Sequence, residues 1–88
     1  MMVAMLASMA AGCGGRISSP EGQACSQELD TANRELDEAK VKGFGGSIQW
    51  LKAATLLTDA NTRYQFESFA VCLDKAKRAR AYIEEAQK

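Results

Sequence analysis

Small and apolar residues recur at alternating intervals of three and four positions in two long stretches of the chain. The first set is Cys25, Leu29, Ala32, Leu36 and Ala39. The second set is Phe69, Cys72, Ala76, Ala79, Ile83 and Ala86. This alternation places each set on one face of an α-helix, whereas a half-buried strand needs an interval of two. An all-α fold is therefore predicted.

Capping signals divide the chain into three helices, at about residues 20–42, 47–63 and 69–87. Ser19 and Pro20 suit the start of the first helix, and Gly43 suits its end. Ser47 and Ser68 are the N-caps expected for the other two. The middle helix has a broad apolar face, made of Trp50, Leu51, Ala53, Ala54, Leu56, Leu57 and Ala60. A face this broad indicates packing against two neighbours, so residues 20–88 are predicted to form an up-down-up three-helix bundle.

Aromatic residues mark both ends of the predicted bundle. Phe44 lies in the glycine-rich turn after the first helix and is expected to close that end of the core. The second connection is expected at about residues 61–69. Its aromatic residues, Tyr64, Phe66 and Phe69, are too apolar for a free loop, so they are expected to fold back over the opposite end.

Two cysteines are expected to meet across this bundle. The first and third helices run parallel in an up-down-up arrangement, and Cys25 and Cys72 stand at nearly equal distances from the ends of their helices. Both also belong to the apolar faces. A Cys25–Cys72 disulfide is therefore predicted, and an oxidising compartment would be needed to form it. The alternative is two free buried cysteines, which pack as small apolar side chains.

The first eleven residues form an apolar segment that includes one serine, Ser8. A helix of about eleven residues is about 17 Å long, too short for a hydrocarbon core of about 30 Å. The length and composition are typical of a signal-peptide core, so residues 1–12 are predicted to be a signal peptide. The alternative is a hydrophobic N-terminus on a cytosolic protein.

Ala11 and Gly12 before Cys13 resemble the lipobox of bacterial lipoproteins, although Ala10 stands where that family usually has Leu. The resemblance implies that Cys13 becomes the first mature residue and carries a lipid. Residues 13–19 would then be the lipid-attachment cysteine and a flexible tether. Gly14, rather than Asp, after this cysteine implies sorting to the periplasmic side of the outer membrane.

Composition excludes several kinds of chemistry. The chain has no histidine, so Ser-His or Cys-His nucleophile pairs and imidazole metal ligands are impossible. Eleven basic residues balance eleven acidic ones, so no net field attracts nucleic acid. We therefore expect no catalysis, no metal, no cofactor and no nucleic-acid partner.

The third helix carries the one local concentration of positive charge, Lys75, Lys77, Arg78 and Arg80. The first helix carries an acidic excess, so these four residues are expected mainly to complement a neighbouring helix surface. The alternative is a basic stripe that binds an anionic envelope partner.

The alanine-rich spacing of residues 24–87 resembles that of small helical lipoproteins of Gram-negative bacteria, whose function is unknown. Their helices are similar to a tetratricopeptide hairpin with a capping helix. The resemblance implies a lipid-anchored envelope protein that serves as a helical interaction or structural module. The alternative is a periplasmic inhibitor or immunity-type protein that neutralises a partner. The oligomeric state stays open, including a dimer through the outer edge of the middle helix.

Overall fold

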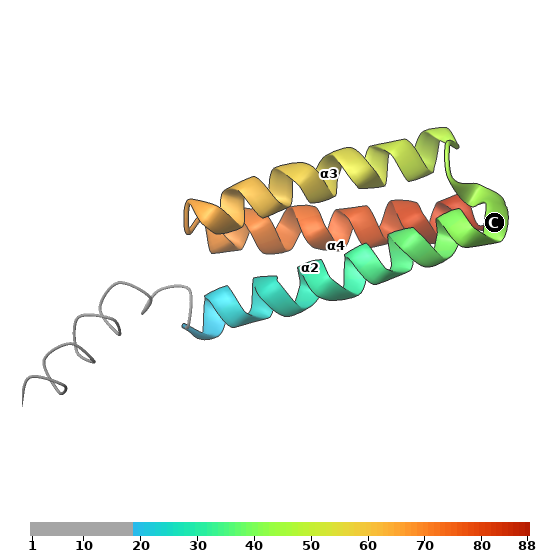
Figure 1. Ribbon diagram of the computed structural model, residues 1–88. Coiled ribbons are helices and arrows are strands. Elements are labelled where there is room, and N and C mark those ends of the chain that lie inside the picture. The colour runs from blue at the N-terminus through green and yellow to red at the C-terminus, as the bar shows by residue number, and fades with distance from the viewer. Residues whose placement is uncertain (1–18) are drawn as a thin grey trace, which may run out of the picture.

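The computed structural model describes residues 19–88, which form three helices arranged side by side (Figure 1). Helix α2 covers Pro20–Ala39, a π-helical turn η1 covers Lys40–Phe44, α3 covers Ile48–Gln65 and α4 covers Phe69–Ala86. Helix α3 runs opposite to α2 and α4 (Figure 1). The predicted up-down-up bundle is confirmed. The predicted signal peptide and Cys13 lie outside the described residues.

Serine caps begin the first two helices as expected. The Ser19 hydroxyl accepts a hydrogen bond from the Gly22 backbone N–H at 3.2 Å, and Pro20 takes the first helical position. The Ser47 hydroxyl accepts from the Trp50 N–H at 3.1 Å. Ser68 occupies the cap position of α4, but its side chain makes no capping hydrogen bond. Local sequence thus determines two of the three helix starts.

The core is narrow because small side chains dominate it. Its buried alanines are Ala32, Ala39, Ala53, Ala60, Ala76 and Ala79. Alanine fills little space, so the helices can approach closely, and the larger buried residues Leu29, Leu57 and Ile83 pack between them. The expected apolar faces of α2 and α4 are confirmed. A hydrogen bond from the Trp50 indole N–H to the Leu36 carbonyl, 3.0 Å long, joins α3 to α2.

The first connection starts earlier than expected. The α-helical part of the first helix ends at Ala39 rather than near Lys42, and the wider turn η1 follows. Gly43 has φ of +98° and Gly46 has φ of +95°, which is the left-handed region that glycine tolerates best. These two residues let the chain reverse into α3, and Phe44 packs against the core as predicted.

The second connection is shorter than expected. Helix α3 continues to Gln65, where the sequence indicated an end near Arg63, and three residues then lead to α4. Two backbone hydrogen bonds close this end: Ser68 N–H donates to the Arg63 carbonyl at 2.8 Å and Glu67 N–H to that of Tyr64 at 3.0 Å. They form a Schellman motif with Glu67 in the left-handed position at φ +61°.

The aromatic closure of this end is only partly as predicted. The rings of Tyr64 and Phe69 lie 5.8 Å apart between centroids, and Phe69 is buried. Phe66 is 76% exposed, so the prediction that it folds back over the core is wrong. It is the C-cap residue of α3, directly before the left-handed Glu67.

Candidate functional site

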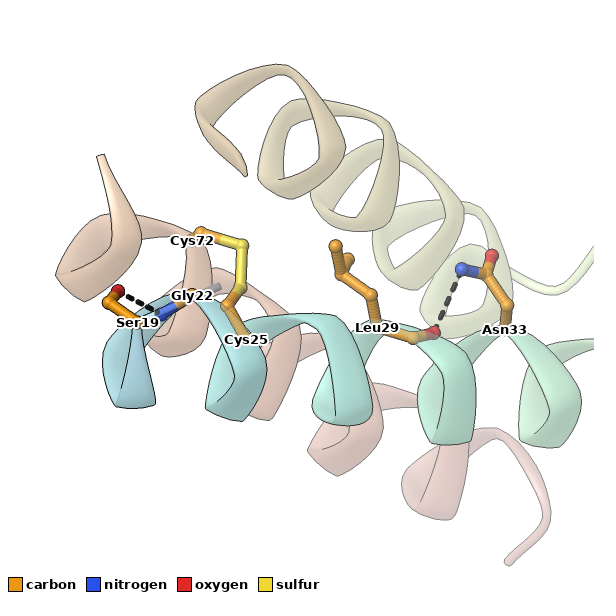
Figure 2. The surroundings of a disulfide bond; sticks show 6 residues. All are labelled: Ser19, Gly22, Cys25, Leu29, Asn33 and Cys72. Atoms are coloured by element: carbon orange, nitrogen blue, oxygen red, sulfur yellow. Dashed lines mark hydrogen bonds between the residues drawn. A yellow bond between two sulfur atoms is a disulfide. The ribbon is translucent and has the colours of Figure 1, made fainter. Parts of the chain in front are cut away.

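The disulfide joins α2 to α4 near the first described residue (Figure 2). Cys25 and Cys72 have Cα atoms 6.0 Å apart, within the range that a disulfide requires, and both residues are fully buried. Ser19 and Gly22 lie beside the bond in Figure 2. The predicted pairing is confirmed, and it ties the opening turns of two parallel helices together.

The opposite charges of α2 and α4 meet at Arg80. Its guanidinium donates two hydrogen bonds to the Glu35 carboxylate, at 2.9 and 3.1 Å, and one to Glu28 at 2.9 Å. The Glu35 and Glu28 carboxylates raise the pKa of Arg80 above its already high value, so this side chain stays charged. Arg80 therefore complements a neighbouring helix, which is the first of the two roles expected for the basic residues.

The other three basic residues of α4 lie in different surroundings. Lys75 forms an ion pair with Asp59 of α3 at 2.8 Å, and this pair lowers the pKa of the Asp59 carboxyl. Arg78 makes one long contact, of 3.9 Å, with the carboxylate of Asp74 on its own helix. Lys77 joins Arg80 in lining a charged hollow of about 660 Å³ between α2 and α4. The four residues are thus divided between two sides of α4.

A more apolar groove of about 400 Å³ lies between α3 and α4. Its lining residues are Ile48, Leu51, Lys52, Thr55, Leu56, Arg78 and Tyr82. Ile48 is 68% exposed and Leu51 is 51% exposed, although both are large aliphatic residues. The Lys52 ammonium nitrogen lies 5.5 Å from the centroid of the Tyr82 ring, within cation–π range. This groove is the candidate binding site of the described domain.

Sequence reasoning missed this groove because it assigned Leu51 to the core. At 3.6 residues per turn, Leu51 lies about 120° around the helix axis from the buried Leu57. The buried residues of α3 are Ala53, Leu57 and Ala60, so its core face is narrower than predicted and leaves Leu51 outside. The sequence did contain a signal for this groove. Ile48, Leu51 and Thr55 follow one another at intervals of three and four residues, which places them along one edge of the helix beside the core face.

Searches for metal ligands and membrane-spanning helices within the described residues, and comparisons with known proteins, add no further candidate site. Within residues 19–88, no three cysteine or carboxylate side chains come together as metal ligands. None of the described helices combines the length and apolar character that crossing a membrane requires. Protein-family models, curated proteins and solved structures were all compared with the chain, and none matched.

Proposed function

We propose that this chain is an exported, lipid-anchored protein of the cell envelope, whose three-helix domain binds another envelope protein without catalysis. The Cys25–Cys72 disulfide carries this proposal. Such bonds persist in the periplasm and outside the cell, whereas cytosolic thiols are kept reduced. A disulfide between two fully buried residues also suits a domain this small, because its hydrophobic core alone supplies little stability.

The cysteine count supports the lipid anchor. The chain has three cysteines, and pairing Cys25 with Cys72 leaves only Cys13. An unpaired thiol in an oxidising compartment is reactive unless it is modified. Acylation of Cys13 would remove that thiol and hold the domain at the membrane. The α3–α4 groove supports the binding role, because exposed aliphatic side chains beside cations are typical of interaction surfaces.

The mass of the mature N-terminus tests this proposal. Produced in a Gram-negative host, the full chain is expected to lose residues 1–12 and to begin at acylated Cys13, with the other two cysteines resistant to alkylation until reduced. Cys13→Ser should abolish acylation and keep the disulfide. A full-length product in the cytoplasm, with Met1 intact and three alkylatable thiols, would contradict the proposal.

A further inference from the structure

The groove between α3 and α4 combines exposed aliphatic side chains with the positive charges of Lys52 and Arg78. Ile48 and Leu51 stand one helical turn apart along α3, while Leu56 and Tyr82 pack against the core beside them. A concave apolar strip between two helices is the usual receptor for the apolar face of a third helix. Single exposed leucines are common on proteins, but this pair lines one hollow.

The charge of the groove indicates what kind of helix fits. Lys52 and Arg78 are the charged residues that line it, and no carboxylate is among the lining residues. Lys52 makes no ion pair with any carboxylate of residues 19–88 and instead lies over the Tyr82 ring. The Arg78 contact with Asp74 is long, at 3.9 Å, and both side chains are more than half exposed. Glu85 lines the adjoining hollow with Arg78 and Tyr82 but forms no ion pair with Arg78, so both cations are available to carboxylates from outside.

We propose that the α3–α4 groove receives an amphipathic helix of a partner protein, with aliphatic residues on its apolar face and Asp or Glu along both edges. The apolar face would cover Ile48 and Leu51, and the acidic edges would reach Lys52 and Arg78. This inference deepens the proposed function, since it names the surface and the class of partner through which an envelope module would bind.

The same charges disfavour a second copy of this chain as the occupant. In a two-fold symmetric dimer the same patch lies on both sides of the interface, so this groove would face itself. Two grooves that carry Lys52 and Arg78 would bring four positive charges together without acidic partners from their linings. Like charges placed opposite each other oppose association, whereas an acid-edged helix removes the repulsion and gains attraction.

Site-specific photo-crosslinking tests the occupant directly. The full chain, produced in the cells that naturally make it, carries p-benzoylphenylalanine in place of Leu51, and a matched chain carries it in place of Gln49. Gln49 is an exposed residue of α3 that does not line the groove. We expect one protein adduct from position 51 and none from position 49, with the crosslinked segment mapping by mass spectrometry to an acid-edged amphipathic helix.

Charge reversal provides the second arm. Lys52→Glu combined with Arg78→Glu should lower the adduct yield at position 51 by about tenfold, equivalent to about 1.4 kcal/mol of binding free energy. Lys77→Glu combined with Lys88→Glu changes the net charge equally away from the groove and should leave the yield unchanged. Thermal unfolding within a few degrees of the parent would show that both double variants remain folded.

Several results would overturn the proposal: no adduct at position 51, an adduct with a second copy or with lipid, a partner segment without acidic edges, or equal losses in the two double variants. The N-terminal mass is measured on the same sample. An acylated chain without an adduct rejects the groove alone. An unprocessed chain crosslinked to an acid-edged helix in the cytoplasm rejects the envelope assignment alone.

Discussion

The two sides of α4 use similar residues for different purposes. On the side of α2, a disulfide joins the two buried cysteines, and the guanidinium of Arg80 is shared by the carboxylates of Glu28 and Glu35. On the side of α3, Ile48 and Leu51 stay exposed and Lys52 lies over an aromatic ring. A charge that finds its partners inside the domain stabilises the fold, whereas one that does not is available for binding.

Removing the disulfide should have the largest effect on thermal stability, because it removes the covalent bond between α2 and α4. The bond spans 47 residues of sequence, and the chain-entropy model assigns it about 4 kcal/mol. Cys25→Ala combined with Cys72→Ala is expected to lower the melting temperature by roughly 15–30 °C, measured by circular dichroism. Cys13→Ser should leave the melting temperature unchanged. A double variant that melts with the parent would show that packing alone holds α2 to α4.

Substituting Arg80, on the α2 side of α4, and Arg78, on the α3 side, gives a matched comparison with a smaller expected effect on stability. Arg80→Ala leaves Glu28, whose side chain is only 17% exposed, without its guanidinium, so we expect a loss of about 1 kcal/mol in the free energy of unfolding. Arg78→Ala removes one long, exposed contact and should cost almost nothing. Urea unfolding measures both variants. Equal losses in the free energy of unfolding would mean that the ion pairs of Arg80 stabilise the fold no more than the contact of Arg78 does.

The smallest expected effect is the pH dependence of stability that comes from the Asp59–Lys75 ion pair, which lies on the α3 side of α4. Lys75 lowers the pKa of this carboxyl in the folded chain, so the pair stabilises the fold above the unfolded value of about 4. That contribution is lost as the pH falls through the lowered pKa. Wild type should therefore exceed Asp59→Asn in melting temperature at pH 6, and the difference should shrink towards pH 2. A difference independent of pH would rule out the ion pair as its source.

The fold was largely predictable because its signals are local or depend on simple geometry. The three-four spacing determined the faces of α2 and α4, and Ser19 and Ser47 marked helix starts that the structure confirms. The pairing of Cys25 with Cys72 followed from the parallel direction of two helices of similar length. The end of α3 was harder to predict, since its Schellman turn places Glu67, rather than glycine, in the left-handed conformation.

The sequence by itself determined the helices and their order, because helical period and capping are properties of neighbouring residues, and the disulfide followed from the directions of the first and third helices. Only the tertiary structure decided that Arg80 is shared between two glutamates while Arg78 faces a groove. It also decided that Leu51 is exposed. The physical reason is that the arc of α3 that becomes buried depends on where α2 and α4 pack against it, which is a property of all three helices together and not of the helical period alone.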